Sequence, residues 1–269
     1  MTVVRSFGTE LRLRRLARHG DSRLLVVPLD HSVSDGPLMP ANLLGPLIAE
    51  LAGSGVDAVV LHQGSVRAVD PAAFGTMALI VHLSASTRHA ADPDAKYLVA
   101  TVSAAVRRGA DAVSVHVNLG SREEARQLAD LAAVAEEADR WGIPVLAMMY
   151  PRGPRIENPN APELVAHAAT LAADLGADLV KVPFAGGTQA MADVVVGCPI
   201  PVLVAGGPAR DGWPALADYV ESIMLSGVAG LAMGRNIFQA PDPAGRAGRV
   251  AALVHPGRVA VPAAALEPV

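Results

Sequence analysis

The chain has 269 residues, of which 51% are hydrophobic and 18% are charged, and its formal net charge at pH 7 is −4. This composition excludes a largely disordered chain, and the slightly acidic balance gives no indication of nucleic-acid binding. The single cysteine, Cys198, excludes an intramolecular disulfide, and because no signal peptide or membrane-spanning run is recognisable we expect a cytoplasmic protein.

Eight apolar runs of strand length are spread along the chain, at residues 23–30, 55–61, 76–84, 109–115, 142–150, 176–182, 198–207 and 227–234. Three of them repeat one phrase, as GVDAVVL, GADAVSV and GADLVKV, and seven helical segments such as 121–142 and 161–176 lie between the runs. This alternation is typical of a parallel sheet covered by helices. Eight units in one domain predict an α/β fold, the (β/α)8 TIM barrel.

No linker interrupts the alternation, so we expect one domain over residues 1–269. The Arg-rich segment at about 8–20 is predicted to form a helix with a solvated face, and residues at about 241–269 a C-terminal helix and tail. Both segments are expected to cover the ends of the barrel.

Polar groups follow the apolar runs at their C-terminal ends. In chain order they are Asp30-His31, His62-Gln63, His82, His116 with Asn118, Tyr150, Lys181, Gly206-Gly207 and Gly234-Arg235-Asn236. In a barrel these ends open onto one face, where the active sites of this fold are built. The alternative is that polarity simply resumes where each strand stops.

Lys181 is the strongest candidate for a catalytic residue among these groups, because the alternation of side chains along the strand points it into the barrel. A buried ammonium is costly unless it is paired or its pKa falls, and a lysine of lowered pKa attacks carbonyls to form a Schiff base. The alternative is a lysine that pairs with a carboxylate or reaches the rim. Lys96, the chain's other lysine, is expected at a helix start and exposed to solvent.

Tyr150 and Asp30 are the candidate proton-transfer groups beside this amine. Tyr150 could instead be a rim aromatic, and Asp30 could cap the next helix or bond to turn amides. Arg67, Arg152 and Arg155 are candidates to meet a substrate carboxylate.

The last two strand ends indicate a phosphate site. Gly206, Gly207 and Gly234 allow backbone N–H groups to approach an anion, and the guanidinium of Arg235 can donate paired hydrogen bonds. Barrel enzymes often bind phosphate at these two loops. The alternative is that the glycines serve only tight turns.

Four strand-end histidines leave a metal-dependent lyase open as a competing function: His31, His62, His82 and His116. Their spacing is not diagnostic, and histidines at a barrel mouth commonly contact substrate. We therefore expect no metal and no organic cofactor, and we treat His31, His62, His116 and Arg152 as possible substrate contacts.

Several motifs together resemble the archaeal-type class I aldolases: VPLDHSVSDGP, VLHQGSVR, ADAVSVHVNLGS, MMYPRG, GADLVKV, PVLVAGGP and GRNIFQ. The similarity is strongest to the 2-amino-3,7-dideoxy-D-threo-hept-6-ulosonate synthases and their fructose-bisphosphate aldolase cousins. It runs in order from about residue 23 to 240. The resemblance implies a Schiff-base lysine at Lys181, an acid/base tyrosine at Tyr150, an assisting aspartate at Asp30, and phosphate-binding segments at Gly206, Gly207, Gly234 and Arg235.

The sequence also departs from that family. Members usually carry a lysine at the position of Gln63 and often another at Ala209, and the segment Val182–Gly187 lacks the usual polar residues. Fewer cations argue against a bisphosphate substrate such as fructose 1,6-bisphosphate and favour a monophosphate donor with a different acceptor.

The sequence therefore predicts an enzyme, a class I aldolase. It would join a keto phosphate, either dihydroxyacetone phosphate-like or a deoxy-ketohexose phosphate, to an aldehyde such as aspartate semialdehyde, in aromatic amino acid or aminohydroxybenzoate biosynthesis. A class I fructose-bisphosphate aldolase is the first alternative, and a non-catalytic phosphometabolite-binding barrel is another. The resemblance further implies a homo-oligomer, such as a pentamer-based ring or a decamer, without nucleic-acid or membrane partners.

Overall fold

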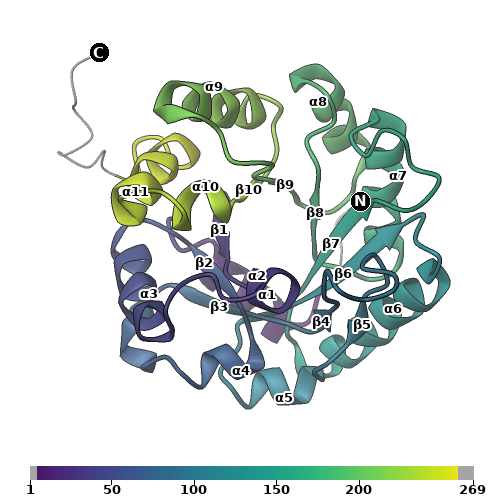
Figure 1. The fold of residues 1–269 in the computed structure, drawn as a ribbon, viewed down its shortest axis with the longest axis horizontal. Helices are drawn as coiled ribbons and strands as arrows, with labels where there is room; N and C mark the ends of the chain where they lie inside the picture. The colour runs from purple at the N-terminus through teal and green to yellow at the C-terminus, as the bar shows by residue number, and fades with distance from the viewer. Residues whose placement is uncertain (1–4, 260–269) are drawn as a thin grey trace.

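The computed structural model describes residues 5–259, in which eight parallel strands close into a barrel (Figure 1). The barrel strands are β1 (Leu24–Pro28), β2 (Ala58–His62), β3 (Ala78–His82), β6 (Ala112–Leu119), β7 (Val145–Pro151), β8 (Leu179–Val182), β9 (Val202–Ala205) and β10 (Gly230–Ala232). Each strand pairs in parallel with the next in this order, and β10 closes onto β1. The predicted (β/α)8 TIM barrel is confirmed.

Helices form a ring outside the strands (Figure 1). The longer ones are α3 (Leu44–Gly53), α6 (Glu124–Trp141), α7 (Pro162–Asp174), α8 (Thr188–Gly197), α9 (Gly212–Met224) and α11 (Pro243–Val254). The segment after β2 is reduced to α4 (Gln63–Val66) and the 3-10 helix η2 (Pro71–Phe74). The segment after β3 holds a small hairpin, β4 (Ser84–Ala85) with β5 (Tyr97–Leu98), before the short α5 (Val102–Val106). Short helices also follow β1 and β10: α2 (His31–Asp35), η1 (Ala41–Leu43) and α10 (Arg235–Phe238).

The core has an inner part, which fills the barrel, and an outer part between strands and helices. On β8, Leu179 belongs to the inner part, whereas Val180 and Val182 belong to the outer part. Because successive side chains on a strand point to opposite faces, Lys181 lies on the inward face with Leu179. The predicted direction of this lysine therefore follows from the register of its own strand.

The two terminal segments have different positions. In α1 (Phe7–Leu16), Leu13 and Leu16 pack on the inner core beside the starts of the strands, so this helix covers one end as expected. By contrast, α11 packs against α3 and α9 in the outer ring, so the prediction that it covers an end is wrong. The predicted tail from residue 260 lies outside the described residues. Within residues 5–259 no helix is both long and apolar enough to cross a bilayer.

The repeated Gly-x-Asp phrases place a carboxylate at the start of three strands. Asp57 accepts a hydrogen bond from the N–H of Leu25, at 2.7 Å. Asp111 and Asp178 accept in the same way from the N–H groups of Leu79 in β3 and Val145 in β7, each at 3.1 Å. Each aspartate thus joins its own strand to the preceding neighbour at the N-terminal end of the barrel, which is a physical reason for the repeat.

Candidate active site

A cavity of about 850 Å³ opens at the C-terminal ends of the strands. The structure places all candidates for catalysis and phosphate binding in its lining, together with most of the possible substrate contacts: Asp30, His31, His62, His116, Tyr150, Arg152, Lys181, Gly206, Gly207, Gly234 and Arg235. Arg67 and Arg155 are exposed and do not belong to this lining. The polar groups at the strand ends therefore converge, as expected for residues carried by parallel strands in register.

The amine of Lys181 lies beside an aromatic wall. Its Nζ is 5.8 Å from the centre of the Tyr150 ring, and the Lys181 side chain is buried, with 6% of its surface exposed. The His116 ring also packs against this phenol, with ring centres 4.9 Å apart, and the Arg152 guanidinium lies 5.4 Å from the centre of the same ring. A carbonyl compound attached to Lys181 would therefore lie next to the tyrosine.

Asp30 is one of three aspartates in the cavity lining, with Asp35 and Asp94. It begins α2 but makes no capping bond with its side chain; instead its oxygens lie 3.6 Å from Nδ1 of His31 and 3.8 Å from Nε2 of His82. Burial acts to raise the pKa of Asp30, but His82, His31, Lys181 and His62 outweigh it and lower the pKa to about 2. Asp30 is therefore a carboxylate at neutral pH, placed to balance positive charge that forms on Lys181.

His82 is a buried neutral imidazole between Asp30 and Ser114. Burial, with further contributions from His62 and Lys181, lowers the pKa of His82 to about 4, although Asp30 acts to raise it. One ring nitrogen, Nδ1, lies 2.8 Å from the hydroxyl of Ser114. With one proton on the ring at neutral pH, the imidazole lies beside Asp30 without adding a charge.

This imidazole predicts a specific pH dependence of stability. Because the folded pKa of His82 is about 4 and a free histidine has about 6.5, the unfolded chain binds more protons between these pH values. The contribution of His82 to the free energy of unfolding therefore falls by about 3 kcal/mol when the pH is lowered from 6.5 to about 4. Urea unfolding at pH 7 and pH 4.5 should show a smaller loss in His82→Asn than in the wild type; an equal loss would contradict the assignment.

A hydrogen-bond network holds the segment between β4 and β5 over the cavity. Asn118 donates through Nδ2 to the carbonyl of Asp94 at 2.8 Å, and Gln127 of α6 donates to the same carbonyl at 3.2 Å. The Oδ1 of Asn118 accepts from Nε2 of His116 at 2.9 Å. This network therefore fixes the His116 ring and the position of the loop together.

The same loop brings in Lys96, which the sequence places incorrectly. Instead of being exposed at a helix start, Lys96 precedes β5, is 9% exposed and lines the cavity. Its amine donates to the hydroxyl of Ser86 and, at 3.2 Å, to the carbonyl of Pro93. Burial, followed by the charge of Arg152, lowers the pKa of Lys96. Only the long-range contacts of the loop reveal this second amine.

The expected phosphate segments lie side by side but contribute differently. Gly206 donates its N–H to the carbonyl of Ala232 in β10, so this N–H is used within the barrel. Gly207 has φ +67°, and a side chain there would be strained. Asn236 holds the loop by donating to the carbonyls of Gly206 and Pro208, at 3.1 and 2.9 Å. The arrangement leaves Gly207 and the adjacent Arg235 at the edge of the cavity.

The cavity is rich in basic side chains although the sequence lacks two lysines that are usual in the family. Besides Lys181, the lining contains five basic side chains: Arg88, Lys96, Arg152, Arg210 and Arg235. Gln63 lies outside the lining and donates to the carbonyl of Val99 at 3.0 Å, so a lysine missing at this position removes no lining charge. Beside Ala209, the Arg210 guanidinium lies 3.7 Å from the centre of the Tyr219 ring. Charge count alone therefore does not exclude a bisphosphate.

Comparisons with known proteins agree with this geometry. The description "DeoC/LacD family aldolase" matches residues 24–240. The 2-amino-4,5-dihydroxy-6-oxo-7-(phosphonooxy)heptanoate synthase of Streptomyces griseus is 56% identical over 249 residues, which cover 93% of this chain and 91% of the relative. The 2-amino-3,7-dideoxy-D-threo-hept-6-ulosonate synthase of Halobacterium salinarum is 40% identical over 249 residues, 92% of each chain.

One similar solved structure shows a reaction intermediate bound to the lysine of that protein. It is an archaeal fructose-1,6-bisphosphate aldolase with the catalytic lysine bound to a carbinolamine intermediate. Its TM-score to this chain is 0.81 at 30% identity, with coverage of 92% of this chain and 99% of that one.

Proposed function

The chain belongs to the DeoC/LacD family of Schiff-base class I aldolases, and we propose that it joins dihydroxyacetone phosphate to aspartate semialdehyde through an imine on Lys181. The observation that carries this proposal is the buried amine of Lys181 on the inward face of β8, 5.8 Å from the Tyr150 ring and within the electrostatic reach of Asp30.

The substrate pair follows from the product that names the Streptomyces griseus relative. That name describes a seven-carbon amino acid with a ketone at carbon 6, hydroxyls at carbons 4 and 5, and a phosphate on carbon 7. Reversing an aldol addition at the bond between carbons 4 and 5 yields dihydroxyacetone phosphate and aspartate semialdehyde. The 7-deoxy product named for the Halobacterium salinarum relative has no oxygen at carbon 7, so its donor part carries no phosphate there.

The mechanism begins when Nζ of Lys181 attacks the ketone carbon of the donor. Loss of water from the carbinolamine yields an iminium ion, whose positive charge the carboxylate of Asp30 balances. The oxygen of Tyr150 accepts the proton from the neighbouring carbon, which forms the enamine, and later returns this proton to the alkoxide that forms from the aldehyde. The enamine carbon then attacks the aldehyde of the acceptor, and water releases the product and the free amine.

The phosphate of the donor would bind at Gly207, Gly234 and Arg235. The N–H of Gly207 and the guanidinium of Arg235 can donate to phosphate oxygens at the edge of the cavity. Gly206 supports this site by packing, since a side chain there would contact Met233 of the adjacent strand end at 2.7 Å. His31, beside Gly234, and His62 remain candidate contacts to the hydroxyl groups of the substrate.

The acceptor carboxylate would lie at Lys96 and Arg152, across the cavity from the phosphate segments. These two cations are close enough for Arg152 to lower the pKa of Lys96, so a carboxylate between them would relieve a repulsion. We expect Lys96→Met to raise the KM for the aldehyde about 10- to 100-fold, because it removes one charge-assisted hydrogen bond, and to change the KM for the keto phosphate little.

Arg88→Met is the matched control for that measurement. Arg88 also lines the cavity, but its guanidinium is paired with Asp35 at 2.9 Å. Its removal should change the KM for the aldehyde less than Lys96→Met does. A KM effect of Lys96→Met on the keto phosphate alone would place Lys96 at the donor instead.

Borohydride trapping tests the proposed reaction directly. The enzyme is incubated with dihydroxyacetone phosphate, fructose 1,6-bisphosphate or a 1-deoxy-ketohexose phosphate, reduced, and analysed by intact-mass and peptide mass spectrometry. We expect dihydroxyacetone phosphate to add one donor at Lys181 as a secondary amine, and release of the heptanoate product when aspartate semialdehyde is supplied without reduction. No adduct with any donor, or an adduct on another residue, would refute the assignment of Lys181.

A further inference from the structure

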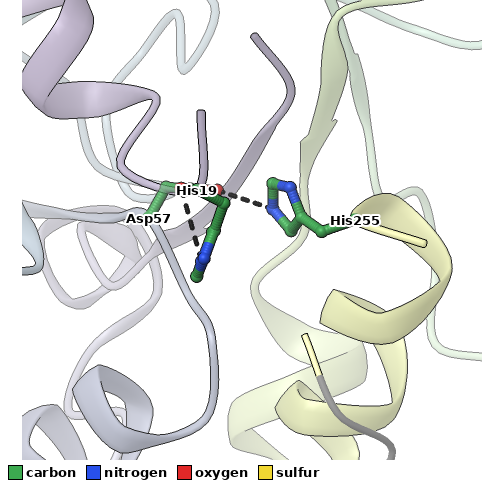
Figure 2. A group of neighbouring side chains, drawn as sticks. All are labelled: His19, Asp57 and His255. Atoms are coloured by element: carbon green, nitrogen blue, oxygen red, sulfur yellow. Dashed lines mark hydrogen bonds and ion pairs between the residues drawn. The ribbon is translucent and has the colours of Figure 1, made fainter. Parts of the chain in front are cut away.

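A second cluster of reactive side chains lies at the opposite end of the barrel from the cavity. His19 follows α1, Asp57 precedes β2 and His255 follows α11, and their side chains meet although they are far apart in the sequence (Figure 2). Each residue offers one possible ligand atom, and these atoms lie within 4.8 Å of one another. Over residues 5–259 no other group of three His, Cys, Asp or Glu residues meets this criterion.

Asp57 is the centre of the cluster and has an unsatisfied oxygen. The residue is completely buried. Its Oδ2 accepts from the N–H of Leu25 at 2.7 Å and lies 2.9 Å from Nε2 of His255. Its Oδ1 is buried without a hydrogen-bond partner and lies 3.7 Å from Nε2 of His19. An unpaired buried carboxylate oxygen is costly, so a cation at this point would remove a real energetic cost.

His255 is oriented as metal-binding histidines commonly are. Its ring is fully buried, and Nδ1 lies 2.9 Å from a carboxylate oxygen of Asp21. Nε2 lies 2.9 Å from Oδ2 of Asp57, which can only accept, so a metal ion would replace the proton on Nε2 while the Nδ1–H bond to Asp21 keeps the ring in place. In this cluster Nε2 faces Asp57 and the space beside His19.

We propose that His19, Asp57 and His255 bind one divalent transition-metal ion, with Zn²⁺ as the ion that best suits the donors. Two imidazole nitrogens and one carboxylate are a common zinc ligand set, with bonds of about 2.0–2.2 Å. One oxygen of Asp57 lies 2.9 Å from Nε2 of His255 and the other lies 3.7 Å from Nε2 of His19, and the three ligand atoms lie within 4.8 Å of one another. Side-chain movements of about 1 Å would bring them around one ion.

The surroundings favour zinc over a hard cation. A second cavity of about 750 Å³ adjoins His19 and is lined by Arg15, Arg18 and Arg258 as well as by Asp111. The guanidinium groups oppose any cation held only by charge, as Ca²⁺ and Mg²⁺ are. Imidazole nitrogens bind zinc by coordination and can offset this repulsion. To bind, His19 must give up its contact with the carbonyl of Gly55, at 3.0 Å.

The bound ion would link three parts of the fold. His19 and Asp21 belong to the segment before β1, Asp57 to the start of β2, and His255 to the end of α11. Because the cluster lies at the N-terminal ends of the strands and Lys181 at the C-terminal half of β8, the ion would stabilise the barrel without contacting the reaction. The proposal therefore does not depend on the proposed aldolase reaction.

The test uses the full chain after treatment with a chelator. Isothermal titration with ZnCl₂ and metal analysis after dialysis should show one Zn²⁺ per chain, and zinc should raise the melting temperature by about 5 °C or more. Co²⁺ in place of zinc should give visible absorption bands of a four-coordinate ion. Aldolase activity should persist without metal, so a failure of either proposal can be told from a failure of the other.

Substitutions identify the ligands. His19→Gln and His255→Gln should each weaken zinc binding at least tenfold. His19 is less buried than His255, so His19→Gln is the variant less prone to misfold and keeps the test valid if His255→Gln does not fold. His167→Gln, at an exposed position on α7, is the matched control and should bind zinc normally, as should His82→Asn. Absence of saturable binding, undiminished binding in both ligand variants, or loss of binding in His82→Asn would each overturn the proposal.

Discussion

Replacing Lys181 by methionine is expected to lower kcat by at least about 10⁴-fold, because no imine can form and the reaction loses its covalent intermediate. Methionine has a similar length and suits the surrounding apolar side chains, since Lys181 is 6% exposed in the barrel interior. The measurement is the steady-state rate of product formation, together with borohydride trapping of dihydroxyacetone phosphate, which should yield no adduct.

Lys181→Arg separates nucleophilicity from charge. A guanidinium keeps the positive charge that lowers the pKa of Asp30 but does not form a Schiff base with the donor. We expect Lys181→Arg to be as inactive as Lys181→Met. Recovery of most of the activity in the arginine variant would show that the residue acts through its charge, and the Schiff-base mechanism at this position would be wrong.

Replacing Tyr150 by phenylalanine is expected to lower kcat by about 10²- to 10⁴-fold, the usual contribution of a positioned proton-transfer group. The ring should remain packed against His116, since its contact at 4.9 Å does not involve the hydroxyl. The exchange of donor protons with deuterated solvent, followed by NMR, should slow by a similar factor. Trapping of the imine at Lys181 should persist, because its formation precedes the proton transfer.

Tyr219→Phe is the control for that experiment. Tyr219 is the other tyrosine in the cavity lining, and its hydroxyl lies 3.4 Å from the carbonyl of Ala205. Its loss should change proton exchange far less than the loss of the Tyr150 hydroxyl. If Tyr150→Phe exchanges donor protons at the wild-type rate, another group carries out this step, and the neutral His116 that packs on the same ring becomes the first candidate.

Much of the site was predictable because each strand carries its own active-site residue. Strand length, alternation and the position at the C-terminal end place Asp30, Tyr150 and Lys181 at one mouth of a parallel barrel without knowledge of any contact. Periodicity is a local property, so it survives in the sequence. The roles of these residues remain predictions that the trapping and substitution experiments test.

The predictions for Lys96 and for the C-terminal helix were wrong because the positions of both depend on contacts with distant segments. The burial of Lys96 results from Asn118 and Gln127, which hold the loop before β5 through the carbonyl of Asp94. The place of α11 in the outer ring depends on its packing against α3 and α9. Neither set of contacts has a local pattern in the sequence.

The repeated Gly-x-Asp phrases also show the difference between a local sequence pattern and a long-range contact. The repeat itself is visible in the sequence, but the bond from Asp57 to the N–H of Leu25 is not. From the sequence, the candidate metal ligands were the strand-end histidines. The structure instead brings His19 and His255 to Asp57 at the other end of the barrel.

Periodic side-chain patterns within single strands were enough to predict the barrel, the face that carries the chemistry and the inward direction of Lys181. Three further features could be learned only from the folded chain: which charges share a cavity, that Asp30 is held as a carboxylate beside a neutral His82, and that His19, Asp57 and His255 meet. Burial, electrostatic interaction and hydrogen bonding between distant segments depend on the three-dimensional arrangement that packing creates.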